Sequence, residues 1–293
     1  MLTSVTVRVP ATSANLGSGF DSLGLALALT EEITVTARHQ TDPSAGLPRL
    51  VLDAARATFR LAHADAPPEL SVASDGAIPV GRGLGASAAA RAAGIVAANA
   101  MLEGALSDDQ LLGLGAGLEG HADNMAPALF GGFQIVVREG EGYRHLAVAL
   151  APGLKVVLLI PEFEMPTAEA RKVLPQTLPR EDVGHNLGRA ALLVAALSQG
   201  RWELLDAATQ DRVHQPARTA IFPAMPHIFD AAKRAGALCA YLSGAGSTIA
   251  AFAAEGEERI ARSMMQEAVA RGYPGRVEIT SPSETGATIT ASA

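Results

Sequence analysis

The chain has 293 residues, of which 48% are apolar and 18% charged, so it can bury a sizeable core. This length favours two domains that share a cleft over one compact domain. The formal net charge of −7 argues against binding to nucleic acid, because such a surface repels phosphates. An anionic small molecule would therefore need a local positive site.

The chain carries one cysteine, Cys239, which rules out an intramolecular disulfide and fits a reducing compartment. The N-terminus lacks the basic and apolar regions of a signal peptide. The longest stretch that resembles a membrane span, 83–102, is rich in Gly and Ala and contains Arg91, which favours a buried helix of a soluble protein. We therefore expect a soluble cytoplasmic protein with neither membrane nor nucleic-acid partners.

Strand and helix patterns alternate along the first half of the chain. Residues 5–9 alternate apolar and polar side chains, as a half-buried strand does, and a polar, glycine-bearing turn follows at 12–19. The other strands that we expect here are 33–37, 70–73 and 133–137, and the helices are 51–61, 86–102 and 108–117.

A second block begins with a buried-strand pattern at 156–160, after the loop around Pro152 and Gly153. We place the domain boundary there, between 1–152 and 153–293. Because strands and helices interleave in both halves, the fold class is α+β or α/β. The remaining elements that we expect are helices at 187–197, 228–235 and 257–271 and strands at 237–242, 249–252 and 276–279.

The most informative segment is the glycine-rich sequence PVGRGLGASAA at residues 79–89. Gly81, Gly83 and Gly85 permit positive φ and a close approach of the backbone to a ligand, and the following helix offers unpaired N–H groups. Together these features can cradle a phosphate. Ser87, in the first helical turn, can direct its hydroxyl to a phosphate or to Mg²⁺, or simply cap the helix.

The segment has three other interpretations. A loop and a helix without any ligand remain an alternative. A P-loop is excluded because neither Lys-Ser nor Lys-Thr follows the glycines. A dinucleotide fingerprint is disfavoured, because it needs an apolar strand that runs into the first glycine, and Asp75, Gly76 and Pro79 interrupt that strand.

A polar cluster, LEGHADN, follows at 118–124. Phosphoryl transfer needs Mg²⁺, which takes one or two protein oxygens together with phosphate oxygens and water, and Glu119 with Ser87 would supply that pair. Asp123 is a candidate general base for a substrate hydroxyl. Taken alone, Glu119 is more typical of a solvated carboxylate at a helix end than of a metal ligand, and His121 of a surface or satisfied buried histidine than of a site residue. The spacing does not indicate a zinc site.

Three motifs resemble those of the GHMP kinases, the superfamily of galactokinase, homoserine kinase, mevalonate kinase and phosphomevalonate kinase. The glycine-rich segment resembles their ATP-binding motif, and SGAGST at 243–248 their C-terminal motif. PATSANLGSGFD at 10–21 is similar to the more specific signature of the homoserine kinases. The departures are Ser18 and Ser247 where proline is usual, Ala86 where serine is usual, and Arg49 where an asparagine near the base is usual.

The resemblance covers essentially the whole chain and implies a fold and a reaction. The fold is an α+β, two-domain GHMP kinase fold, with an ATP-binding N-terminal domain that contains a left-handed βαβ unit and a ferredoxin-like C-terminal domain. The reaction is the ATP-dependent phosphorylation of the side-chain hydroxyl of L-homoserine to O-phospho-L-homoserine, a step towards threonine. ATP and Mg²⁺ are the implied cofactors.

The resemblance also assigns roles to residues. Ser87 and Glu119 would hold the metal, and Asn124 and Asp123 complete the catalytic set, although homoserine kinases work without a dedicated base. The residues that would bind the nucleotide are Pro79, Gly81, Arg82, Gly83, Leu84, Gly85, Ala86, Ser87, Ala88, Gly244 and Gly246. Those that would bind the substrate are Asn15, Asp21, His121, Arg171 and Arg218.

The charges of L-homoserine agree with this set. Arginine suits the substrate carboxylate because its planar fork can bond both oxygens, and Asp21 would meet the ammonium. Asn15 and Asp21 are also residues that organise turns. Two alternative functions stay open: another GHMP kinase, of the mevalonate or isoprenoid-precursor type, and a non-catalytic GHMP-fold binding protein. The two arginines argue against the first, and Ser87 with Glu119 against the second. The oligomeric state is open, with a homodimer as one option.

Overall fold

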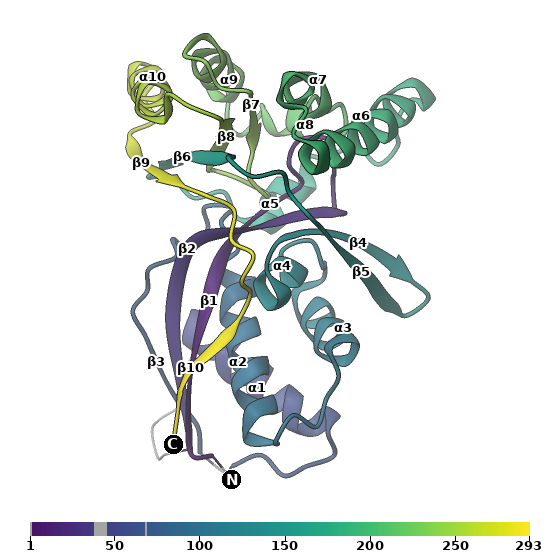
Figure 1. Ribbon diagram of the computed structural model, residues 1–293, viewed down its shortest axis with the longest axis vertical. Coiled ribbons are helices and arrows are strands. Elements are labelled where there is room, and N and C mark those ends of the chain that lie inside the picture. The colour runs from purple at the N-terminus through teal and green to yellow at the C-terminus, as the bar shows by residue number, and fades with distance from the viewer. Residues whose placement is uncertain (1, 38–45, 68) are drawn as a thin grey trace.

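The computed structural model describes residues 2–37, 46–67 and 69–293, which form two β-sheets and the helices that pack on them (Figure 1). The first sheet has six strands in the order β10-β1-β2-β4-β5, with β3 paired to β2. Its strands are β1 (Ser4–Ala14), β2 (Leu23–Thr36), β3 (Ser71–Ser74), β4 (Phe133–Glu139), β5 (Gly142–Val148) and β10 (Thr288–Ser292). Its helices are α1 (Leu47–Leu61), α2 (Ala86–Met101), α3 (Asp108–Glu119) and α4 (Met125–Phe130).

Strand β1 follows from its alternation of side chains. Val5, Val7 and Val9 are fully buried, whereas Thr6 and Arg8 lie on the other face. The strand pairs antiparallel with β2, with Val7 opposite Ile33, so two apolar rows face the helices.

Alanine and glycine let helix α2 pack closely against its neighbours. A Cβ at Gly94 would lie 2.2 Å from the backbone oxygen of Val51 in α1, so a larger residue there would separate the two helices. The close packing buries α2 almost completely and holds its N-terminus in place. That end of α2 follows the glycine-rich loop.

The second sheet is antiparallel, in the order β7-β8-β6-β9, and α9 and α10 pack on it (Figure 1). Its strands are β6 (Lys155–Pro161), β7 (Cys239–Leu242), β8 (Ile249–Ala253) and β9 (Gly275–Thr280). The other elements are α5 (Thr167–Lys172), α6 (Arg180–Gln199), the 3-10 helix η1 (Trp202–Leu204), α7 (Leu205–Ala208), α8 (Gln215–Arg218), α9 (Met225–Arg234) and α10 (Glu257–Ala270).

The structure differs from the sequence-based expectation at the turn 12–19. Strand β1 continues to Ala14, because Thr12 and Ser13 are buried and pair with β2. Only the residues between β1 and β2 form the turn, and Asn15 and Asp21 in it have positive φ. Thr12 and Ser13 are polar although they are buried, so the sequence shows no strand pattern there and does not indicate this extension of β1.

The last strand links the two halves of the chain. Strand β10 pairs antiparallel with β1, and the backbone N–H of Ser4 donates to the carbonyl of Ala293, so both ends lie together in Figure 1. The first sheet therefore contains a strand from beyond residue 153. The division at 152/153 stays a prediction, although the strands on either side of it, β5 and β6, belong to different sheets. Within the described residues, no helix combines the length and apolarity that a membrane span requires.

Candidate active site

The glycine-rich loop is held between the two halves of the chain by backbone hydrogen bonds. On one side, the N–H of Thr12 in β1 donates to the carbonyl of Leu84 at 3.0 Å. On the other side, the N–H of Thr248 donates to the carbonyl of Arg82, and Ser243 Oγ donates to that of Gly83 at 2.7 Å. The other two sequence motifs, 10–21 and 243–248, therefore position the loop.

Helix α2 begins at this loop without a side-chain cap. Its N-cap residue is Gly85, with φ of 70°, and no side chain among the described residues bonds the first-turn N–H groups. These groups carry the positive end of the helix dipole and have no intrahelical acceptor. They face a pocket of about 320 Å³, which Ala86 and Ser87 line together with Glu119, His121 and Asn124. This pocket has the donors that a phosphate needs.

Ser87 and Glu119 meet at one end of the pocket. Ser87 Oγ donates a hydrogen bond of 2.9 Å to Glu119 Oε2. Arg91, one turn further along α2, donates through Nη1 to both Ser87 Oγ and Glu119 Oε2. The Glu119 side chain is only 10% exposed. A hydroxyl and a carboxylate side by side are oxygen ligands that Mg²⁺ accepts together with phosphate oxygens and water.

Asp123 is hydrogen-bonded to His121 and to the backbone of Asn124. Its Oδ1 accepts from the N–H of Asn124 and pairs with Nδ1 of His121 at 2.8 Å, and its side chain is buried. Burial alone would lower the pKa of His121, but the hydrogen bond and charge of Asp123 and the charge of Glu119 raise that pKa above its ordinary value. Since His121 lines the pocket and Asp123 is satisfied beneath it, the geometry favours Asp123 as a residue that orients His121.

The predicted substrate residues form a second cluster. Arg171 and Asp21 form a two-pronged ion pair, with Arg171 Nη2 2.6 Å from Asp21 Oδ1 and Nη1 3.1 Å from Oδ2. Both side chains are more than one third exposed. The hydrogen bond to Asp21 raises the pKa of Arg171. In this structure the two charges satisfy each other at the surface of the cluster.

Arg218 belongs to the same cluster but is buried. Nε donates to the carbonyl of Ala170, and Nη1 donates to the carbonyl of Gly244 and to Nδ1 of His214. Nη2 has no hydrogen-bond partner within the described residues. Burial, and then the charge of Arg171, lowers the pKa of Arg218 to about 10, so its guanidinium stays charged at neutral pH. The Nη2 group of this buried guanidinium can thus donate hydrogen bonds to an anion.

The pocket and the substrate cluster share Gly244. Its carbonyl accepts hydrogen bonds from Arg218 Nη1 and from Nδ2 of Asn15, and Gly244 lines the pocket. Asn15 Oδ1 in turn accepts from the N–H of Asp21. A ligand in the pocket and one at the cluster would therefore be neighbours.

The structure brings thirteen of the predicted site residues together as the lining of one pocket. They are Pro79, Gly81, Arg82, Gly83, Leu84, Gly85, Ala86, Ser87, Glu119, His121, Asn124, Gly244 and Gly246. Ala88 is buried in α2 instead. The remaining predicted residues, Asn15, Asp21, Asp123, Arg171 and Arg218, belong to the adjoining hydrogen-bonded groups described above.

Arg82 lies in the pocket wall but directs its guanidinium to the second sheet. Nε donates to the carbonyl of Pro161, Nη2 to that of Glu162 and Nη1 to that of Val80. Its side chain also pairs with Glu164 at 3.3 Å. These contacts favour a role for Arg82 in joining the loop to β6 rather than in direct contact with a ligand.

Sequence reasoning missed several residues of the site. Leu47, Leu50, Met165 and Thr167 line the pocket from α1 and from the segment after β6. Their distance in sequence from the glycine-rich loop concealed them. The sequence gives Arg91 no role in the site, although its position four residues after Ser87 puts both side chains on one face of α2.

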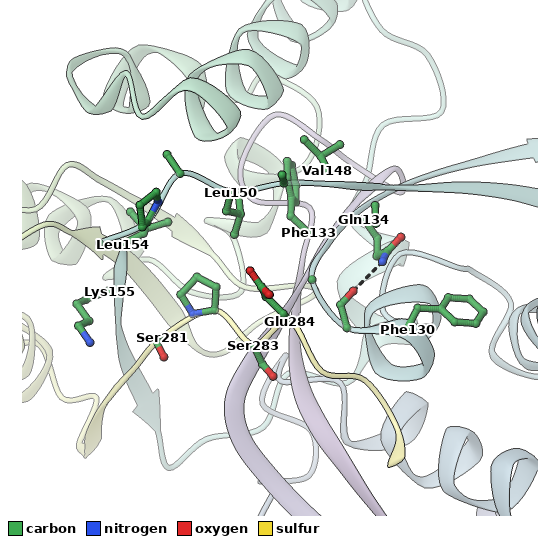
Figure 2. Close-up of a pocket in the computed structure, with 18 residues that line it drawn as sticks. Phe130, Phe133, Gln134, Val148, Leu150, Leu154, Lys155, Ser281, Ser283 and Glu284 are labelled. Carbon is green, nitrogen blue, oxygen red and sulfur yellow. Dashed lines mark hydrogen bonds between the residues drawn. The ribbon is translucent and has the colours of Figure 1, made fainter. Parts of the chain in front are cut away.

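A larger cavity, of about 630 Å³, lies elsewhere, where β4 and β5 meet 149–155 and 281–284 (Figure 2). Leu150, Leu154 and Phe133 line it, and Glu284 and Lys155 are its charged groups. The described residues that line it include none of the predicted site residues and no helix N-terminus with free donors. The smaller pocket is therefore the candidate site, despite its size.

Comparison with known proteins identifies the family of the chain. The family model for the GHMP kinases N terminal domain matches residues 49–132, and that for the GHMP kinases C terminal matches 193–271. A homoserine kinase from Moorella thermoacetica is 39% identical over 97% of this chain and 99% of its own length. A homoserine kinase from Thermus thermophilus is 42% identical over 85% of this chain and 87% of its own length.

Solved structures give the same result. The crystal structure of a homoserine kinase from Cytophaga hutchinsonii superposes with a TM-score of 0.88 at 26% identity, over 99% of this chain and 98% of that one. A mevalonate diphosphate decarboxylase from Staphylococcus aureus shares the fold at a TM-score of 0.72, with 14% identity over 99% of both chains. These comparisons confirm the expected two-domain GHMP kinase fold, and the chain belongs to the homoserine kinase family of GHMP kinases.

Proposed function

We propose that this chain transfers the γ-phosphoryl group of ATP to the side-chain hydroxyl of L-homoserine, with ADP and O-phospho-L-homoserine as products. The observation that carries the proposal is the junction at Gly244. At Gly244, the pocket that contains the N-terminal N–H groups of α2 lies next to the substrate cluster, which holds charges of both signs. The names of the relatives support the same substrate.

The pocket supports the nucleotide half of the reaction. The first-turn N–H groups of α2 and the loop glycines would hold the phosphates of ATP, with Leu47 and Leu50 as apolar wall. Ser87 and Glu119 would hold Mg²⁺, which neutralises developing charge on the phosphoryl group when it is bound. Glu119 Oε1, which has no hydrogen bond within the described residues and lies 4.0 Å from His121 Nε2, is an oxygen available for this purpose.

The cluster supports the amino-acid half. Asp21 would accept the substrate ammonium, and Arg171 with the free Nη2 of Arg218 would donate to the carboxylate. The ammonium of a zwitterion can pair with Asp21 and its carboxylate with Arg171, so each charge of the Asp21–Arg171 pair keeps a partner when the substrate binds. This need for both signs of charge is what separates the amino acid from mevalonate.

Positioning carries most of the rate enhancement in this account. The substrate hydroxyl would lie near His121 and Asn124, between the cluster and the helix N-terminus. His121 and Asn124 are both held by Asp123, so their polar groups are oriented before a ligand arrives. The chain offers no second acid in the pocket wall beside Glu119 among the described residues, which favours transfer without a dedicated base.

An ADP-release assay over a panel of hydroxylated substrates tests the proposal. With L-homoserine, mevalonate, galactose and shikimate at equal concentration, we expect turnover with L-homoserine at least a hundredfold above the others. Equal or higher turnover with mevalonate would instead favour the other kinase type, and ATP binding without turnover would favour a binding protein. The expected cytoplasmic location and the oligomeric state stay predictions.

A further inference from the structure

Arg91 contacts both residues that would hold the metal. It lies four residues after Ser87 on α2, and its Nη1 donates to Ser87 Oγ and to Glu119 Oε2. These are its hydrogen-bond partners within the described residues. Its side chain is 16% exposed and that of Glu119 is 10% exposed, so water screens this ion pair only weakly.

The contact uses one oxygen of the Glu119 carboxylate. Oε2 accepts from Arg91 and from Ser87, whereas Oε1 is directed towards His121. A cation held at this place would share the carboxylate with a fixed guanidinium, and the two positive charges would repel each other in a poorly screened region. The carboxylate is also kept in a single orientation, because two donors hold Oε2.

We infer that Arg91 is a positioning residue that makes cation binding depend on the nucleotide. It satisfies Glu119 while the site is empty and lowers the affinity for a free divalent cation. The phosphates of ATP add the negative charge that outweighs this repulsion, so the protein takes the metal together with the nucleotide. This inference rests on the proposed role of Ser87 and Glu119 as metal ligands.

A titration with Mn²⁺ alone, followed by the electron paramagnetic resonance signal of the free ion, tests the inference on the full chain. In Arg91→Met the positive charge is removed, and we expect the dissociation constant for Mn²⁺ to fall at least tenfold, which corresponds to about 1.4 kcal/mol. Arg91→Gln, which is also neutral and keeps a hydrogen-bonding group, should behave alike. Arg91→Lys keeps the charge and should bind Mn²⁺ as weakly as the wild type.

Two controls separate this effect from others. Arg144→Met makes the same change in net charge at an exposed site that pairs with Asp109 and Glu139, and it should leave Mn²⁺ affinity unchanged. Adding Glu119→Gln to Arg91→Met should remove the gain. With a non-hydrolysable ATP analogue present, the wild type and Arg91→Met should differ less than they do without it.

Mn²⁺ affinities of the Met and Gln variants equal to or weaker than that of the wild type would overturn the inference. Circular dichroism shows whether each variant is folded. If Arg91→Met is not folded, the Mn²⁺ affinity of Arg91→Gln decides the question. The titration contains no L-homoserine and involves no turnover. Failure of the substrate proposal in the ADP-release assay is therefore a separate outcome from failure here.

Discussion

At the scale of single residues, the buried fork of Arg218 is the main support for recognition of a carboxylate. Arg218→Leu should raise the KM for L-homoserine at least thirtyfold, roughly 2 kcal/mol, because the substrate carboxylate would lose a desolvated partner. The KM for ATP should change little, since the nucleotide pocket has other donors. Arg212→Leu, an exposed arginine paired with Asp182, is the matched control. Steady-state kinetics with equal KM values for both variants would remove this role.

His214 explains why Arg218 stays in place. Its ring is fully buried and stacks on Phe20 at 5.2 Å, its Nδ1 accepts from Arg218, and its Nε2 donates to the carbonyl of Gly17 at 2.8 Å. The contact with Arg218 requires the neutral ring, because Nδ1 can accept a hydrogen bond only when the single ring proton is on Nε2. Burial above all lowers the pKa of His214 to about 4, while the charge of Asp211 opposes this shift, that of Arg218 adds to it and that of Asp21 opposes it.

The depressed pKa of His214 leads to a prediction about pH and stability. Between the unfolded pKa of about 6.5 and the folded one of about 4, the unfolded chain binds a proton at His214 that the folded chain does not. Stability is therefore lost as the pH falls through this window, by up to roughly 3 kcal/mol. His214→Gln should flatten the free energy of unfolding between pH 7 and pH 5, measured by urea titration. An unchanged slope would show that other groups are responsible.

At the scale of elements, the start of α2 determines the shape of the pocket. Gly85 has φ of 70°, and a Cβ there would lie 1.9 Å from Thr12 Oγ1. Gly85→Ala should therefore lower the free energy of unfolding by about 1–2 kcal/mol for the positive φ and by about 1–3 kcal/mol more for the clash. Gly76→Ala is the matched control, since Gly76 has φ of 65° and no described atom lies within 4 Å of the added Cβ. Equal losses in thermal or urea unfolding would mean that the contact with Thr12 is unimportant.

The elements differ in how well the sequence predicts them. Hydrophobic periodicity predicts the central elements, such as α2 and β8, because their burial leaves a regular pattern. It fails for β5, whose side chains are mostly exposed and whose pairing depends on β4. It also fails for β10, which is exposed along its length and is defined only by β1. An exposed strand forms because it pairs with a strand that is distant in sequence, and the local pattern of residues carries no information about that partner.

The residues of the candidate site also differ in how well the sequence predicts them. The glycine-rich loop and Glu119 were predicted as parts of one site because local motifs mark them, and both line the same pocket. Asp21 and Arg171 lie 150 residues apart in sequence, and their motifs predict two separate contacts to a substrate, whereas the structure pairs them with each other. Contacts between charged side chains that are far apart in sequence follow from the fold and not from either motif alone.

At the scale of the whole molecule, the C-terminal strand joins the two halves. Strand β10 covers the outer edge of β1, the strand that also supports the glycine-rich loop through Thr12. Removal of residues 287–293 should lower the melting temperature by several degrees, because it exposes the backbone edge of β1. It deletes none of the residues of the candidate site. An unchanged melting temperature would show that β10 contributes little to the first sheet.

The identity of the phosphorylated product tests the central claim most directly. We expect ³¹P nuclear magnetic resonance of a reaction with ATP, Mg²⁺ and L-homoserine to show one phosphomonoester, formed in equal amount to ADP and with the mass of O-phospho-L-homoserine. Glu119→Gln should slow its formation at least a hundredfold, about the cost of losing one electrostatic group in a transition state. Formation of inorganic phosphate without the ester, or of an ester only when mevalonate replaces L-homoserine, would contradict the account.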